Sequence, residues 1–286
     1  MPREPGSDPP TPLPGWMASA LLACVSAAVV LLGAAMAAYP GGTWLDPRAP
    51  GHDFWLNFFC DLTQPVALNG APNRLGAALG LSGMLALVVA LGPFWWLVSR
   101  LSFSARLGAA TRAAGLISTV GLVAVALTPS LSFGLLHAAA VLTASVPGLC
   151  AAALAVAGLR DAPALRWIGG GSLLVAVADA ALYARQVLEP GPTPAALPVL
   201  QKVAALGLLA WMVGVGGMAL VRRPSRGPRC PRRPGARSPW CRASGRSRSP
   251  SGSGRSGRAV GSADRPAAPS PRSAAPSEVR RSPRTG

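Results

Sequence analysis

Two groups of polar side chains in this chain have residue types and spacing suited to ligand binding or proton chemistry. The first lies in the segment His52–Leu62, where Asp53, Asn57 and Asp61 recur at every fourth position beside a row of aromatic rings. On a helix, this spacing places the polar residues on one side and the rings on the other. The segment therefore predicts a short amphipathic helix at a membrane surface.

The second group consists of ionisable residues inside long apolar runs: His137, Asp179, Arg185 and Lys202. An ionisable group at the centre of a membrane span costs roughly 2.5 to 3.5 kcal/mol on insertion scales, so each one needs a physical reason. Asp179, Tyr183 and Gln186 follow one another at helical spacing and predict a single polar stripe. That stripe should face protein or water rather than lipid.

The elements that must position these groups are six apolar runs, each long enough to cross a membrane as a helix of roughly 20 residues. The runs cover residues 16–39, 75–98, 107–128, 133–159, 167–188 and 199–221. They predict an all-α fold, a polytopic membrane bundle of six transmembrane helices over residues 16–222, with the short amphipathic helix in its first loop. The tripeptide Ala35–Ala37 resembles a signal-peptide cleavage site, but the length of the first run favours an uncleaved anchor.

The segments on either side of the bundle differ from it in composition. Residues 1–15 are polar and rich in proline, and residues 223–286 are a low-complexity mixture of Arg, Ser, Pro and Gly, so both are predicted to be disordered. Residues 222–286 hold 17 arginines against Asp264 and Glu278, which places +15 of the net charge of +17 there. This tail either contacts anionic lipid headgroups or is a solvated extension, which we favour. Membrane lipids are the expected partners, and no specific nucleic acid is expected.

Basic residues near the ends of the runs gather beside alternate connections: Arg100, Arg106, Arg112, Arg160, Arg166 and Arg222. Short loops rich in Arg and Lys are retained on the cytoplasmic side of a membrane. Both termini are therefore predicted to be cytoplasmic, in an inner or plasma membrane. The loop that contains His52–Leu62 is predicted to be exoplasmic.

Several chemistries are disfavoured by the residue inventory. His52 and His137 are the two histidines of the chain, too few for a multi-haem cytochrome or a three-histidine zinc hydrolase. The five cysteines show no metal or disulfide spacing, and the chain has no Gly-rich phosphate loop or nucleophile elbow. We therefore expect no cofactor and no metal site, although one histidine and two aspartates could hold a single metal weakly, and we favour a non-enzymatic function over an enzymatic one.

The predicted topology brings the unusual polar residues to the outer half of the bundle: Asp53, Asn57, Asp61, Asn73, His137, Asp179, Tyr183 and Lys202. One interpretation is an outward-facing polar pocket, with Asp179 as a ligand-binding carboxylate or proton carrier and His137 as an acid or base. The other is structural: Asp179 pairs with Lys202 or Arg185, and His137 caps a turn. The residues support the two interpretations about equally.

The first loop and its flanks also resemble a known family. The stretches Tyr39–Thr43, Phe54–Leu62 and Leu68–Asn73 are similar to those of a family of bacterial multi-spanning membrane proteins known as domain of unknown function 998. By helix number, the chain is more distantly similar to the Frag, DRAM and Sfk group of six-helix membrane proteins. The resemblance covers about residues 16–222 and implies the fold and a membrane location, but no activity. Four residues of this chain match motif positions of the family, with no role implied for them: Asn57, Asp61, Asn69 and Asn73.

Three hypotheses about function follow from these observations. The leading one is a non-enzymatic membrane protein that binds a lipid or small ligand, or lets it pass, through the outer polar pocket. The competing one is a lipid-headgroup enzyme that uses Asp61, His137 and Asp179. The third is a structural or assembly partner in a membrane complex, which would tolerate mutations in the pocket.

Overall fold

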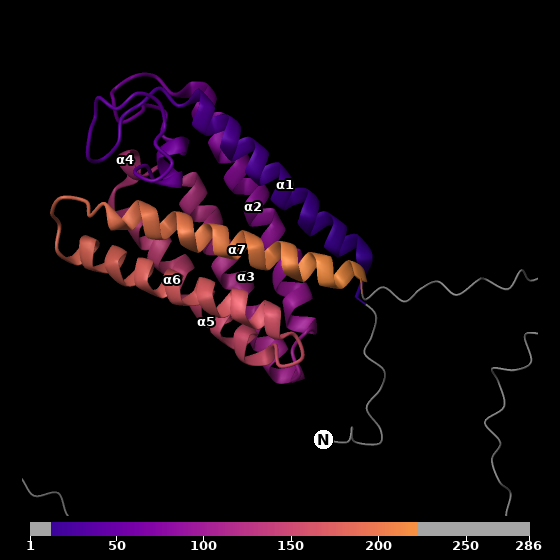
Figure 1. Cartoon of the computed structure of the whole chain (residues 1–286). Coiled ribbons are helices and arrows are strands. Elements are labelled where there is room, and N and C mark those ends of the chain that lie inside the picture. The colour runs from indigo at the N-terminus through magenta and orange to yellow at the C-terminus, as the bar shows by residue number, and fades with distance from the viewer. Residues whose placement is uncertain (1–12, 222–286) are drawn as a thin grey trace, which may run out of the picture. The chain divides into compact units, whose positions relative to one another are not determined.

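The computed structural model describes residues 13–221, and this part of the chain folds into long helices with one extended loop (Figure 1). Six of its helices are long and apolar enough to cross a membrane: α1 Gly15–Ala38, α2 Arg74–Arg100, α3 Ala105–Leu127, α5 Leu135–Gly158, α6 Pro163–Leu188 and α7 Ala196–Val221. Each begins and ends within four residues of its predicted bounds. The all-helical, six-span architecture is confirmed, and the protein is an integral, multi-pass membrane protein.

Local sequence explains several helix boundaries. Proline lacks an N–H and is favoured in the first turn, where α6 begins at Pro163. The connection between α3 and α5 contains the short helix α4, Ser130–Phe133, and Gly134 with φ +44° separates α4 from α5. The segments predicted to be disordered, 1–15 and 223–286, lie outside the described residues except for residues 13–15.

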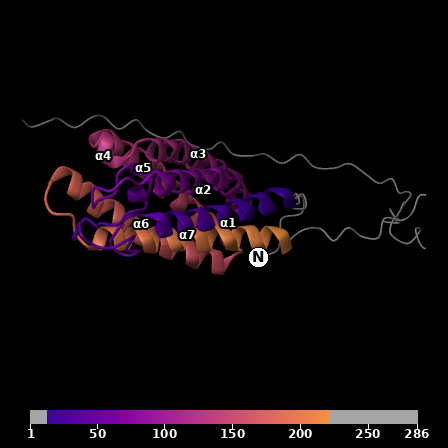
Figure 2. The same cartoon turned by 90° about the horizontal axis from the view of Figure 1, so that it is seen from above.

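The six long helices form a closed ring. Each packs against its neighbours in the sequence, and α7 returns to pack against α1. Figure 2 shows α2 between α1 and α3, with α6 and α7 lying beside each other. The α1–α2, α3–α5 and α6–α7 connections lie at the same end of this ring, which we call the loop end (Figure 1).

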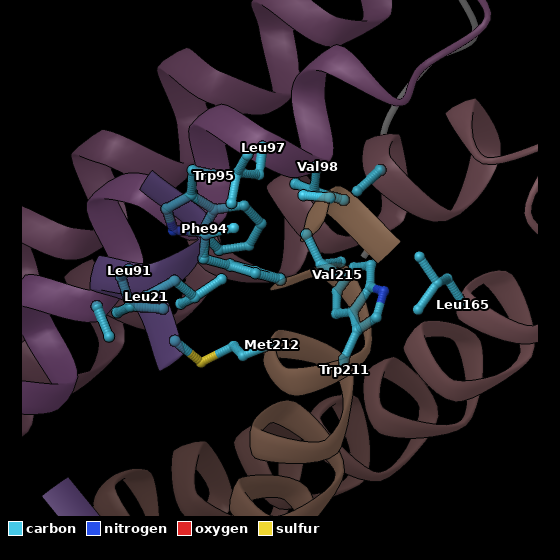
Figure 3. Close-up of a cluster of buried hydrophobic side chains, with 14 of the residues drawn as sticks. Leu21, Leu91, Phe94, Trp95, Leu97, Val98, Leu165, Trp211, Met212 and Val215 are labelled. Atoms are coloured by element: carbon cyan, nitrogen blue, oxygen red, sulfur yellow. The ribbon is translucent and has the colours of Figure 1, made fainter. Parts of the chain in front are cut away.

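A cluster of large apolar side chains fills the ring toward the opposite end (Figure 3). The rings of Phe94 in α2 and Trp211 in α7 pack edge to face, with their centroids 5.3 Å apart and their planes at 76°. The two indoles of the cluster fit against glycines: a Cβ at Gly115 of α3 would lie 2.3 Å from Trp95, and a Cβ at Gly169 of α6 would lie 2.6 Å from Trp211. The missing side chains thus allow each indole to wedge between helices.

The α1–α2 connection, residues 39–73, folds over the loop end. Isolated β-bridges join Gly41 to Pro50 and Val66 to Pro72. Gly42 has φ +89°, and a Cβ there would lie 2.4 Å from the backbone nitrogen of Asn69, so this crossing requires glycine. Further along, Leu62 packs with Tyr39 and buries its side chain completely.

The amphipathic helix predicted in this loop is shorter than the segment His52–Leu62. The structure forms a turn and then the 3₁₀-helix η1, Phe59–Thr63. Asp53 caps a single turn by accepting from the N–H groups of Trp55 and Leu56, and the Asn57 N–H closes that turn on the Asp53 carbonyl. The next N–H, that of Phe58, donates to the Asp61 side chain instead of continuing the helix. Such local bonds compete directly with helix formation.

Candidate functional site

Asp61 is the centre of a buried hydrogen-bonded cluster in the loop. Its side chain is fully buried, with Oδ1 accepting from Trp44 Nε1 at 3.1 Å. Oδ2 accepts from the Phe58 N–H at 2.8 Å and from Asn57 Nδ2 at 3.3 Å. Three donors on one carboxylate offset much of the cost of burying it.

The other polar residues of the loop bind its backbone. Asn57 Nδ2 donates to the Gly42 carbonyl at 2.8 Å, and Asn57 Oδ1 accepts from the Asp53 N–H at 2.9 Å. Asn73 precedes α2 as expected of a cap, but its Nδ2 donates to the carbonyls of Leu62 and Gln64 instead. These side chains therefore hold the path of the loop.

Two residues of α7 attach the loop to the ring. The fully buried Lys202 donates from Nζ to the Asn57 carbonyl, and the same ammonium lies 4.2 Å from the centroid of the Phe59 ring. Next to it, Gln201 Oε1 accepts from the Phe59 N–H at 2.9 Å. A backbone acceptor and an aromatic face are both favourable partners for a buried ammonium.

Burial sets the protonation of the loop residues. It raises the pKa of Asp61, against the lowering effect of its three hydrogen bonds, and it raises the pKa of the Cys60 thiol, with a further contribution from Asp61. Burial, together with the charge of Lys202, lowers the pKa of His52 to about 4. His52 is therefore neutral at pH 7, and Cys60 is a protonated, weakly reactive thiol.

A cavity of about 470 Å³ lies inside the ring, between the loop and the aromatic cluster. Helices α2, α3, α5, α6 and α7 line its walls, loop residues Trp44, Phe58, Phe59 and Cys60 cover it, and Trp95 and Trp211 reach its other end. On α6 its lining extends from Gln186 back to Ser172, a separation of 14 residues or about 21 Å along the axis. The cavity is thus long as well as large.

The walls are mostly apolar, with polar side chains toward the loop end. His137, Asp179, Tyr183, Gln186 and Gln201 line this part. Asp179 and Tyr183 lie one turn apart on α6, as the predicted polar stripe requires. The space is therefore amphipathic along its length.

His137 and Asp179 differ in how they are held. His137 Nδ1 contacts the Thr128 carbonyl, so Nδ1 carries the proton and Nε2 of the neutral ring is an acceptor. Within residues 13–221, Asp179 has no hydrogen-bond or ion-pair partner: Arg185 pairs with Glu189 at 3.1 Å, and Lys202 bonds to Asn57. Asp179 is therefore a membrane-embedded carboxylate that lines the cavity and has no hydrogen-bonded or ion-paired partner among the described residues.

The structure thus divides the sequence-predicted site residues into two sets. His137, Asp179 and Tyr183 line the cavity. The others lie outside its lining, within the loop or between the loop and its neighbouring helices: Asp53, Asn57, Asp61, Asn73 and Lys202. Trp44 and Phe58 cover the cavity and were not predicted as site residues, because the sequence does not show that the loop folds back over the ring.

Two further findings bear on function. Among the described residues, no group of three His, Cys, Asp or Glu side chains is placed to hold a metal ion. Comparisons with known protein families, with curated proteins and with solved structures find no match to this chain.

Proposed function

We propose that this membrane protein binds an amphiphilic ligand, a lipid or a lipid-like small molecule, in the cavity of its ring and does not transform it chemically. The observation that carries this proposal is Asp179, a carboxylate that lines a long and mainly apolar cavity and has no hydrogen-bonded or ion-paired partner within residues 13–221. An ionisable residue at membrane depth marks a functional site by default, because its insertion is costly. A ligand with a polar head and an apolar tail matches both parts of this space.

The dimensions support the same class of ligand. A volume of about 470 Å³ is within the range of roughly 300 to 1,000 Å³ that small-molecule sites occupy. The lining on α6 extends over about 21 Å of a hydrocarbon core of roughly 30 Å. A compact polar solute would leave the deep apolar part empty, whereas an alkyl chain fills it.

The enzymatic alternative has less support from the geometry. It requires Asp61, His137 and Asp179 to act together, but both carboxylate oxygens of Asp61 accept hydrogen bonds inside the loop, and Asp61 does not line the cavity. His137 and Asp179 both line the cavity, but among the described residues no hydrogen bond joins them, and no group of three His, Cys, Asp or Glu side chains is placed to hold a metal ion.

We further propose that the loop end is exoplasmic and that both termini are cytoplasmic, in an inner or plasma membrane. The arginines near the α2–α3 and α5–α6 connections support this orientation. Kinship with the family of domain of unknown function 998 is part of the same proposal. Its support is that motif positions Asn57, Asp61, Asn69 and Asn73 all make hydrogen bonds that shape the loop.

The binding proposal can be tested by filling the cavity. Ala176 of α6 lines it, whereas Ala178, two residues further on, lies on the exposed face of the same helix. We expect Ala176→Phe to abolish quenching of the cavity tryptophans by a chain-brominated hexadecanol in nanodiscs, and Ala178→Phe to leave it intact. Exposed Trp16 and Trp167 are replaced by Phe in all samples to reduce quenching from the bilayer.

Three results would count against the proposal. Equal quenching of both variants would mean that the probe does not enter the cavity. Hydrolysis or modification of added phospholipids by the purified protein, lost in Asp179→Asn, would support the enzymatic hypothesis instead. A subunit that co-purifies with the protein regardless of the Ala176 substitution would support the assembly hypothesis.

A further inference from the structure

The charges that surround the cavity define its ligand more narrowly than its shape does. Among the described residues that line it, Asp179 is the formally charged one, and none is lysine or arginine. Of the other polar groups nearest the loop end, His137 through Nε2 of its neutral form and Gln186 through its side-chain oxygen offer acceptors, whereas Tyr183 and Gln201 also offer neutral donors. A site built this way has no cation to receive a phosphate, sulfate or carboxylate.

Aromatic rings complete the same part of the lining. Trp44, Phe58 and Phe59 cover the cavity, and Tyr183 lies one turn from Asp179. Trp44 and Phe58 meet edge to face, with centroids 6.5 Å apart. A carboxylate combined with several aromatic faces is the set of groups that recognises ammonium ions, including quaternary ones.

Lys202 is the basic residue next to the loop end of the cavity, and its charge does not remove the preference of the cavity for cations. Its ammonium bonds to the Asn57 carbonyl over the Phe59 ring and is not part of the lining. The carboxyl groups whose charges act on it are Asp61, Asp179 and Asp53, and of these four residues Asp179 alone lines the cavity. The loop end of the cavity therefore attracts cations even with Lys202 charged.

On the basis of the proposed function, we infer that the ligand of this cavity carries an ammonium group on a long apolar chain, with the ammonium beside Asp179 and the rings and the chain directed toward Trp95 and Trp211. The ammonium can belong to a phospholipid headgroup or to a free long-chain amine. Both present the same chemistry to the site.

The test compares probes that share one chain and differ in headgroup. The full-length protein in nanodiscs is titrated with hexadecyltrimethylammonium, hexadecanol and hexadecyl sulfate, each brominated at the same chain position, and quenching of the cavity tryptophans is followed against mole fraction in the bilayer. We expect half-saturation by the ammonium probe at about a tenfold lower mole fraction than by the alcohol, and weaker binding of the sulfate. Asp179→Asn should reduce the preference for ammonium over alcohol to below about threefold while the alcohol still binds.

Equal binding of the ammonium and alcohol probes, or tighter binding of the sulfate, would overturn this inference. If Ala176→Phe still blocked the alcohol in that case, the proposed function would stand without it. Binding of no probe would overturn both. A chain-brominated phosphatidylethanolamine then identifies the source: binding comparable to the ammonium probe supports a lipid headgroup, and binding at least about tenfold weaker supports a free amine.

Discussion

The loop over the ring buries several polar residues that would be costly if they were unpaired. Asp61 and Asn57 satisfy each other and the backbone around them, and Lys202 supplies a donor from outside the loop. Sequence spacing identified these residues as unusual but could not assign their partners. Those partners are loop backbone groups and Trp44, whose positions depend on how the loop folds.

His52 should make the stability of this loop depend on pH. Its pKa is lowered to about 4 in the folded protein, against about 6.5 when unfolded. The unfolded chain therefore binds the proton first as the pH falls, so the contribution of His52 to stability is complete above about pH 6.5 and is lost progressively toward pH 4. We expect the apparent melting temperature to fall over this interval, and to fall less in His52→Phe.

Phenylalanine is a suitable replacement because the His52 ring packs edge to face against Tyr39, with centroids 5.7 Å apart, and a phenyl ring retains that contact. Asp61, whose pKa is raised, contributes a pH dependence of the opposite sign, which is common to both proteins. Identical slopes for the wild type and His52→Phe between pH 6.5 and pH 4 would show that His52 does not titrate as described.

At the scale of elements, the helices were predictable and the attachment of the loop was not. Apolar runs determine where α1 and α7 lie in the sequence, because each must cross the membrane as a helix. The loop is attached to α7 by Gln201 and Lys202, about 140 residues away from the groups they bind. No local pattern contains such a pairing, and in the sequence Lys202 is simply a charge near a helix end.

Removal of the Lys202 ammonium should loosen the cover of the cavity. Lys202→Met keeps the length of the side chain but leaves the Asn57 carbonyl without its donor, and a lost hydrogen bond to a charged group costs about 1.5 to 3 kcal/mol. We expect the partly buried Cys60 thiol to react with a maleimide about tenfold faster or more, with the other four cysteines replaced by Ser. Val203→Met, on a more exposed side of α7, is the control and should leave the rate unchanged. An unchanged rate in Lys202→Met would mean that Gln201 and the apolar contacts hold the loop without it.

At the scale of the whole molecule, helix number followed from the sequence, but the hollow ring did not. Membrane helices all have apolar surfaces, so hydropathy does not distinguish a face toward lipid from a face toward protein. Closure of the ring by α7 against α1 depends on side-chain packing in the buried cluster that includes Leu21, Met212 and Val215 (Figure 3). The cavity depends on the same packing, because Trp95 and Trp211 of this cluster close its deep end.

The last prediction concerns the orientation of the whole bundle in the membrane. This orientation matters for function, because the side on which the loop end lies is the side from which a ligand reaches the polar end of the cavity. Ala195 in the α6–α7 connection and Asp161 in the α5–α6 connection are both exposed and lie at opposite ends of the ring. In a background without native cysteines, Ala195→Cys should react with a membrane-impermeant maleimide on intact cells. Asp161→Cys should react only after the cells are permeabilised, because arginine-rich connections stay in the cytoplasm. The reverse pattern would place the cavity's polar end at the cytoplasmic face, where Asp179 would meet ligands made inside the cell.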